Sequence, residues 1–193
     1  MSREQFIKLS KKFNTPRKVQ KWLKGFSYNK KDTLRSAFSC YESQEAHCME
    51  AAMLAAAILE HRGYPPLIIS FESIDELDHV IFVFKEKTGW GSVGRSRDKG
   101  LHGRAPMFRS LRALAMSYFD PYVDKTGKIT GYQVVHLDET KSNWRFSVKN
   151  VWKTERYLLE LPHNKIKFSA KRYQRLRKKY EKEGPLLKGK HWW

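Results

Sequence analysis

Cys48 is the residue whose sequence surroundings best fit a chemical role. The polar segment 41–47 ends beside it, and residues 49–59 are almost all apolar. This pattern predicts a helix that begins at the cysteine and is buried on nearly every side. A thiol in the first helical turn lies near the positive end of the helix dipole and unpaired backbone N–H groups, which favour the nucleophilic thiolate. The alternative is that Cys48 is a small buried residue of the core, the usual fate of a free cysteine.

A nucleophilic cysteine needs a base, usually a histidine. His79 begins the apolar run 79–84, one helix–strand–loop unit after Cys48, so we expect both residues at the same edge of a sheet. His102 is a reserve candidate for the base. His47 is expected to point its ring away from the thiol, because neighbouring side chains at a helix start diverge. The oxyanion of an acyl intermediate would be held by the backbone N–H of Cys48, aided by Gln44 or His47.

A third catalytic residue is expected on the strand predicted over residues 90–96. Alternate residues of a strand face the same way, so Trp90, Ser96 and, if the strand persists, Asp98 would share one face. Asp98 is the only carboxylate on that face and is the candidate for orienting His79. The alternative is that Asp98 is a loop carboxylate paired with an arginine, and the arginines in reach are Arg95, Arg97 and Arg104.

Periodicity and turn residues predict the elements that hold these candidates. A helix over 16–24 should be capped by Thr15 and begin with Pro16. The other predicted helices cover 2–12, 110–119 and 170–183, and the predicted strands cover 67–71, 79–84, 90–96, 129–137 and 144–148. Residues 36–41 are predicted to form a short turn, and 152–161 fit a strand or a helix. The Gly- and Arg-rich segment 95–109 is predicted to be a long loop that covers a cleft.

The run CMEAAMLAAAILEHRGYPP from Cys48, followed by a strand, then DHV around His79 and a strand with Trp90, resembles the transglutaminase-like superfamily of papain-type fold. The resemblance covers residues 15–98. It implies an α+β fold in which a buried central helix packs on an antiparallel sheet. In that superfamily the cysteine opens the central helix, the histidine starts a strand, and an Asp follows a tryptophan by about four residues. Cys48 and His79 match the first two roles.

The third role departs from the superfamily pattern, because Gly94 stands four residues after Trp90 and Asp98 lies four residues further on. Either Asp98 is reached by a shifted strand end, or Ser96 replaces it, or the triad is incomplete. The resemblance implies acyl transfer through a thioester on Cys48: hydrolysis of a peptide, isopeptide or amide bond, amide exchange or crosslinking. The side chains expected to bind substrate are Trp90, Arg95, Ser96, Arg97, His102 and Arg104.

Charge indicates the kind of partner. The 193 residues include 38 Lys and Arg against 20 Asp and Glu, a formal net charge of +18, which favours anionic partners. The Arg-rich loop favours an anionic peptide or amide substrate, with self-contained salt bridges as the alternative. A core domain is predicted over 1–164 and a basic helical tail over 165–193. The alternative function is an inactive papain-type scaffold whose tail binds nucleic acid or an acidic protein, and a weaker alternative is attachment of the tail to an anionic membrane.

Other classes of protein lack support in the sequence. The two cysteines and seven histidines show neither CxxC nor HExxH spacing, and there is no phosphate-binding glycine motif, so no metal or cofactor is predicted. The start is too polar for a secretory leader and no apolar run approaches the roughly 18 residues of a membrane span. With only two cysteines, a reducing, cytoplasmic location is predicted.

Overall fold

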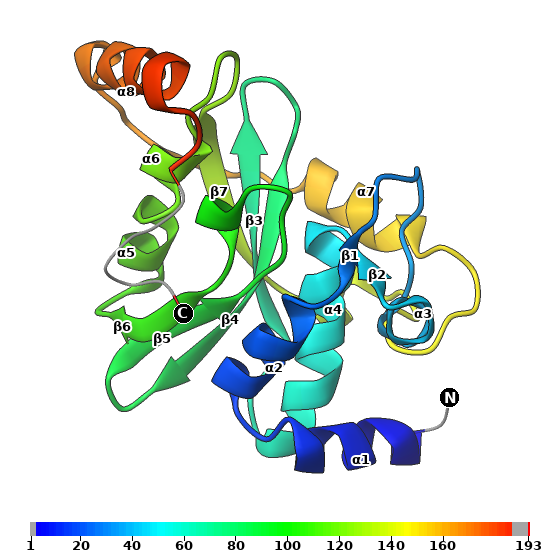
Figure 1. Cartoon of the computed structure of the whole chain (residues 1–193). Helices are drawn as coiled ribbons and strands as arrows, with labels where there is room; N and C mark the ends of the chain where they lie inside the picture. Colours follow the sequence, from blue (N-terminus) through cyan, green and yellow to red (C-terminus); the bar gives the residue numbers. More distant parts are fainter. Residues whose placement is uncertain (1–2, 187–192) are drawn as a thin grey trace.

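The central element of the fold is helix α4, Cys48–Leu59, in which every residue after the cysteine is buried. In the computed structural model, which describes residues 3–186 and 193, this helix lies between a sheet and the N-terminal helices (Figure 1). The alanines of α4 allow close approach on all sides. The predicted buried helix that begins at Cys48 is therefore confirmed.

The sheet has six strands, all antiparallel, in the order β6-β5-β4-β3-β7-β8. Their bounds are β3 Leu67–Ser73, β4 His79–Glu86, β5 Gly89–Val93, β6 Arg104–Phe108, β7 Ile129–His136 and β8 Asn164–Lys165. β4 is central, and its residues from His79 to Phe84 are all buried because helices cover both faces of the sheet. The chain is thus an α+β fold, as predicted.

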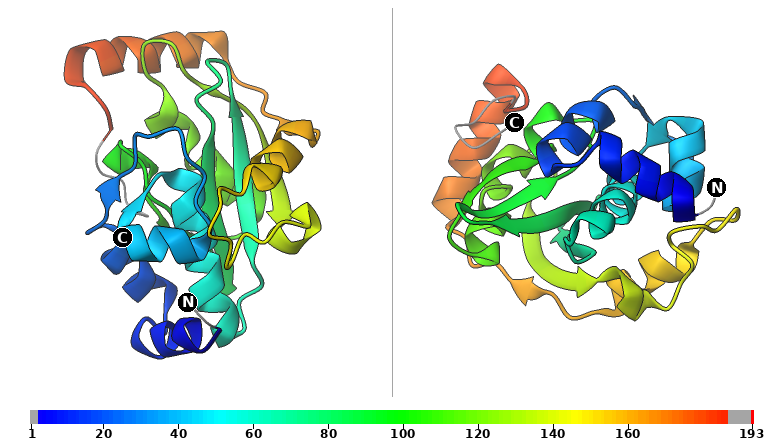
Figure 2. Two further views of the ribbon diagram at one scale, coloured as in Figure 1. Left: turned by 90° about the vertical axis from the view of Figure 1, so that its right-hand side faces the viewer. Right: turned by 90° about the horizontal axis from the view of Figure 1, so that it is seen from below.

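Alternation along β3 and β4 divides the core into two clusters. Ile68 and Phe82 face α4, whereas Ile69 and Ile81 face the opposite side. The helices on the α4 side are α1 Arg3–Lys12, α2 Pro16–Leu23, α3 Ala37–Ser43 and α7 Trp152–Glu160. Those on the other side are α5 Leu111–Met116, α6 Phe119–Tyr122 and α8 Ala170–Glu183 (Figure 2).

Local signals explain several helix ends. Thr15 caps α2 by accepting the backbone N–H of Lys18, and Pro16 takes the first position, as predicted. Ser169 caps α8 by accepting the N–H of Arg172, which confirms the predicted helix in the basic tail. The division between a core domain and a tail at residue 164 stays a prediction.

Four predictions of local structure were wrong or incomplete. Residues 36–41 form most of helix α3, capped by Ser36, instead of a turn. Residues 144–148 form no strand: the backbone turns there, with the N–H of Ser147 donated to the Asn143 carbonyl and the Trp144 carbonyl accepting from Ala37 at the start of α3. The predicted loop 95–109 contains the 3-10 turn Lys99–Leu101 (η2) and strand β6, and the predicted strand 90–96 ends at Val93.

The remaining short elements complete the chain. β1 Ser27–Tyr28 pairs in parallel with β2 Glu45–Ala46, and the 3-10 turns η1 and η3 cover Glu60–Arg62 and Leu137–Thr140. Within residues 3–186 and 193, no helix is long and apolar enough to cross a bilayer.

Candidate active site

Cys48 occupies the first turn of α4, next to a tightly bonded helix cap. The ring Nδ1 of His47 lies 3.3 Å from the backbone N of Met49, and the buried carboxylate of Glu50 accepts the backbone N–H of His47 at 3.1 Å. Glu50 also accepts the backbone N–H of Arg35 at 2.8 Å and the side-chain amide of Asn29 at 3.0 Å. These bonds fix the helix start, and the first backbone N–H groups of α4, that of Cys48 among them, have no partner inside the helix.

His79 is the first residue of β4 and is buried. Its ring stacks with that of Phe71 at a centroid distance of 6.1 Å and lies 5.9 Å from that of Tyr118. Its Nε2 lies 3.0 Å from the carbonyl oxygen of Leu101. A carbonyl only accepts, so Nε2 carries a proton and donates it, which leaves Nδ1 as the ring nitrogen that can exchange a proton during a reaction.

The two histidines together ionise Cys48. Burial alone would raise the pKa of the Cys48 thiol, but hydrogen bonds and positive charge from His47 and His79 outweigh burial and lower that pKa to about 5. Burial would lower the pKa of His47, but its hydrogen bond to Cys48, with the charges of Cys48 and Glu50, raises that pKa to about 9. Both shifts act in the same direction and favour a thiolate on Cys48 beside a protonated His47.

The two protonation states of His47 use Nδ1 differently. The neutral ring accepts the N–H of Met49 across a long 3.3 Å contact, whereas the protonated ring carries a positive charge beside the Cys48 thiolate. In both states Nε2 faces the carbonyl of Thr33 at 2.9 Å and carries a proton. The raised pKa of His47 favours the protonated ring, whose positive charge stabilises the neighbouring thiolate. The His47 ring thus turns toward the first turn of α4, where Nδ1 lies 3.3 Å from the backbone N of Met49, and does not point away from Cys48 as expected.

Asp98 lies in the same cleft as Cys48 and His79 but does not orient the histidine. β5 ends at Val93, so Asp98 lies beyond the strand, at the residue that precedes η2, where its side chain forms no capping bond and its backbone N–H donates to Ser96 Oγ at 3.3 Å. Among the described contacts, the hydrogen-bond partner of the His79 ring is the carbonyl of Leu101. The structure thus places Cys48 and His79 together, as predicted. The group that bonds the His79 ring is the carbonyl of Leu101 and not the carboxylate of Asp98.

Two other predicted site residues lie away from this cleft. Gln44 is exposed at the end of α3, in the left-handed conformation with φ 52°, and its side chain donates to the carbonyl of Tyr41. Trp90 packs against the second core cluster, with Lys85 5.7 Å from its ring centroid. Neither residue lines the cleft at Cys48.

The arginines of the segment 95–109 bond mainly to backbone carbonyls of the same segment. Arg104 is fully buried and donates to the carbonyls of Gly100 and His102, with Tyr118 4.0 Å beneath its guanidinium. Arg95 donates to the carbonyls of Phe26 and Ser96. The acceptors in these bonds are backbone carbonyls. The bonds therefore match neither the predicted contact with a substrate nor the alternative salt bridge with a carboxylate.

The other predicted site residues of the segment 95–109 are His102, which has a structural role, and Ser96 and Arg97, which line the cleft. His102 is buried, its Nε2 lies 3.0 Å from the Ser96 carbonyl, and burial lowers its pKa to about 4, which keeps it neutral and makes it a structural residue. Ser96 and Arg97 line the cleft, and Arg97 is exposed there.

Two hollows meet at Cys48. One has a volume of about 540 Å³ and runs along residues 96–98 and Tyr122, and the other has a volume of about 830 Å³ and runs along the ends of β3 and α7. The residues common to both are Tyr28, His47, Cys48, Leu77, Asp78 and Glu155. An extended substrate would therefore pass over the thiolate with room on either side.

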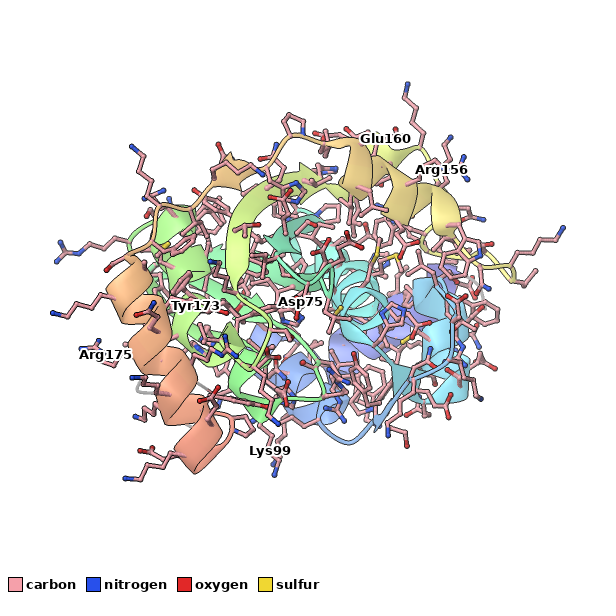
Figure 3. The ribbon with its side chains drawn as sticks, turned by 90° about the horizontal axis from the view of Figure 1, so that it is seen from above. Asp75, Lys99, Arg156, Glu160, Tyr173 and Arg175 are labelled. Atoms are coloured by element: carbon pink, nitrogen blue, oxygen red, sulfur yellow. The ribbon has the colours of Figure 1, made fainter. Side chains whose placement is uncertain are left out.

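These hollows are acidic although the molecule is strongly basic. The carboxylate residues that line them are Asp32, Glu72, Asp75, Glu76, Asp78, Asp98, Asp124 and Glu155. Only Lys30, Lys31 and Arg97 supply lysine or arginine among the described lining residues. Figure 3 looks down on this end of the molecule, with Asp75 near the centre of the face. Close carboxylates focus a negative potential inside a cleft even when the net charge is positive.

Tyr28 is a site residue that sequence reasoning missed. It lines both hollows, and burial together with the charge of Cys48 raises its pKa to about 12, so its hydroxyl stays protonated. A protonated hydroxyl beside the thiolate is a hydrogen-bond donor for an oxyanion. The sequence around Tyr28 is a polar loop without periodicity, and no local pattern marked the residue.

Sequence comparisons add no assignment to this geometry. No protein-family model matches the chain, and no curated protein matches it either. Within the described residues there is also no group of three or more metal-ligating side chains.

Proposed function

We propose that the protein is a cysteine-dependent acyl-transfer enzyme that hydrolyses or exchanges an amide bond, built on a papain/transglutaminase-like core. The single observation that carries this proposal is the placement of Cys48 at a buried helix start, between His47 and His79 and where two hollows meet, and the lowered pKa of its thiol agrees with that placement. A core cysteine without a chemical role has no need of two histidines. The resemblance of residues 15–98 to the transglutaminase-like superfamily supports the same chemistry.

The reaction follows from the positions of these groups. The Cys48 thiolate attacks the carbonyl carbon of the amide, and the oxyanion of the tetrahedral intermediate takes hydrogen bonds from the backbone N–H of Cys48 and the hydroxyl of Tyr28. The C–N bond then breaks as the leaving amine takes a proton from the imidazolium of His79, which leaves a thioester on Cys48 and a neutral His79. Water or a second amine attacks the thioester, His79 accepts its proton, and the thiolate returns.

Charge in the cleft favours a substrate with positive groups near the reacting carbonyl. The sequence favoured an anionic substrate, but Arg95 and Arg104 bond backbone carbonyls, and carboxylates outnumber lysines and arginines along both hollows. A carboxylate-lined cleft attracts cations and repels anions. We therefore assign the site a peptide or amide that carries lysine- or arginine-like charge.

A trapping experiment tests the proposal. The purified chain is treated briefly with an activated ester, and peptide mass spectrometry locates the acyl group. We expect acylation at Cys48, reversal by hydroxylamine, and loss of the adduct in C48A. The matched control is C40A, because Cys40 is the other free thiol and burial raises its pKa. Acylation of neither cysteine, or of both equally slowly, would favour the inactive scaffold.

A further inference from the structure

Helix α8 presents two opposite faces, of which the inner one is packed. Tyr173 and Leu176 contact the second core cluster, and Tyr173 lies 6.4 Å from Phe168 between ring centroids. Lys128 lies 4.4 Å from the ring centroid of Tyr173. Figure 3 shows Tyr173 on the side of α8 that faces the body and Arg175 on the side that faces away. The apolar face of this helix is therefore already used inside the molecule.

Cations on the flanks of α8 are paired. Arg172 bonds Asp120 of α6 at 2.6 Å, Arg177 bonds Glu181 at 3.2 Å, and Lys179 lies 3.8 Å from Glu183. The pair with Asp120 joins α8 to α6, whereas the other two pairs lie within α8 and neutralise its sides. Exposed pairs of this kind add little stability each, so their main effect here is on the charge distribution.

The outer face carries four more cations, which we call the outer stripe: Lys171, Arg175, Lys178 and Lys182. They follow one another at i, i+4, i+7 and i+11, so they fall within about 60° of the helix circumference and extend over about 16 Å. All four are exposed, and none forms an ion pair within the described part of the chain. The stripe lies directly opposite the packed residues Tyr173 and Leu176.

We propose that the outer stripe binds the phosphate backbone of a nucleic-acid duplex. A row of one cation per helical turn, fixed on a rigid body with a net charge of +18, matches a regular row of phosphates, which is a sequence-independent electrostatic target. Contacts to phosphate oxygens fix the position of a protein on a duplex but carry no sequence information. Binding is accordingly independent of sequence and strongly dependent on salt.

Two other polyanions fit the observations less well. An anionic membrane is bound by amphipathic helices that insert an apolar face, but the apolar face of α8 is packed on the protein. An acidic protein is bound through aromatic or aliphatic anchors at the centre of an interface, and the outer stripe has none. A phosphate backbone needs only positioned cations.

The test is a salt titration of duplex binding with the full chain. A fluorescent DNA duplex of random sequence is titrated between 50 and 200 mM salt, with binding followed by anisotropy. Four phosphate contacts give a slope of log affinity against log salt of about −3.6, so wild-type affinity falls about 10²-fold over this range. The variant K171Q/R175Q/K178Q/K182Q should lose most of that slope and bind at least about tenfold more weakly at the lower salt.

A matched variant separates the stripe from net charge. K8Q/K11Q/R17Q/K18Q removes the same number of lysines and arginines from exposed positions of α1 and α2, at the other end of the molecule in Figure 1. It should retain the wild-type slope. Equal losses in both variants would show binding through overall charge and would overturn the proposal, as would unchanged binding in the stripe variant. Stronger competition by polyglutamate or phosphatidylserine vesicles than by unlabelled duplex at equal charge would also overturn it.

Discussion

At the scale of single residues, the site depends on how charge is shared between one sulfur and two imidazoles. His47 and His79 approach Cys48 from different elements, the helix cap and the first residue of β4, and both lower the pKa of its thiol. The sequence predicted the positions of Cys48 and His79, because the local pattern of apolar residues indicates where α4 and β4 begin. It misjudged His47, because the direction of a cap side chain depends on contacts such as that with the Thr33 carbonyl.

The His79 ring could be oriented by the Leu101 carbonyl or by the Asp98 carboxylate, and mutation distinguishes the two. Because the Leu101 carbonyl accepts the Nε2 proton, D98N should change kcat/KM less than about fivefold and leave the pH profile unchanged. H79Q should lower kcat by about 10²- to 10⁴-fold through loss of the base. Steady-state kinetics on a cationic amide substrate checks both. A loss of about 10⁴-fold in D98N would instead assign Asp98 the triad role predicted from the sequence.

His47 is expected to act on the charge of the thiol. In H47Q the neutral amide can still bond the Thr33 carbonyl but supplies no positive charge, so the pKa of Cys48 should rise and its alkylation at pH 6 should slow by about tenfold or more. Iodoacetamide kinetics between pH 4 and 9 measure this. The matched variant H61Q, on the far end of α4, should behave as wild type. An unchanged profile in H47Q would leave His79 alone responsible for the thiolate.

At the scale of elements, the correctly predicted helices and strands are those whose sequences show a clear hydrophobic pattern or a capping residue. α2, α4 and α8 have capping residues or a continuous apolar run, and β3, β4 and β7 have β-branched runs. α3 and β6 escaped detection because both are short and tertiary contacts help to hold them, although Ser36 does cap α3. Ala37 of α3 donates its N–H to the Trp144 carbonyl, and β6 is fixed by pairing with β5.

The buried carboxylate of Glu50 stabilises the start of α4 by accepting hydrogen bonds from His47, Arg35 and Asn29. E50A removes an acceptor used by the backbone N–H groups of His47 and Arg35 and by Asn29, so the free energy of unfolding should fall by about 2 to 4 kcal/mol. E50Q keeps an acceptor oxygen and should lose less. Denaturant unfolding of both variants gives the comparison. Equal stability of E50A and wild type would mean that the cap bonds do not fix the helix start.

At the scale of the whole molecule, charge is separated: a negative cleft opens in a positive body. The net charge of +18 was readable from composition, but the acidic lining was not, because its carboxylates come from segments far apart in the sequence, such as Asp32, Asp75 and Glu155. Because negative and positive charge lie in different parts of the molecule, the two proposed ligands would bind at different sites. A cationic substrate goes to the cleft, and an anionic polymer goes to the outer stripe of α8.

Substrate charge can be tested directly. Two amide substrates that differ only in lysine or glutamate beside the reacting carbonyl should differ in kcat/KM by about tenfold or more, with the lysine substrate preferred and the difference shrinking as salt rises. D75N/D124N should reduce the preference without abolishing turnover, because both residues line the cleft away from the sulfur bonds. A preference for the glutamate substrate would contradict the assignment of a cationic substrate.

The most direct test of the central claim is the pH dependence of Cys48 alkylation in the wild-type chain, with Cys40 as the internal reference and mass spectrometry to separate the two. The thiolate reacts and the thiol does not, so a pKa lowered to about 5 predicts a rate that rises through pH 5 and stays high at pH 6 to 8. Burial raises the pKa of Cys40, which should remain slow throughout that range. A Cys48 rate that rises only above pH 8, in parallel with an ordinary thiol of pKa about 8.5, would contradict the account.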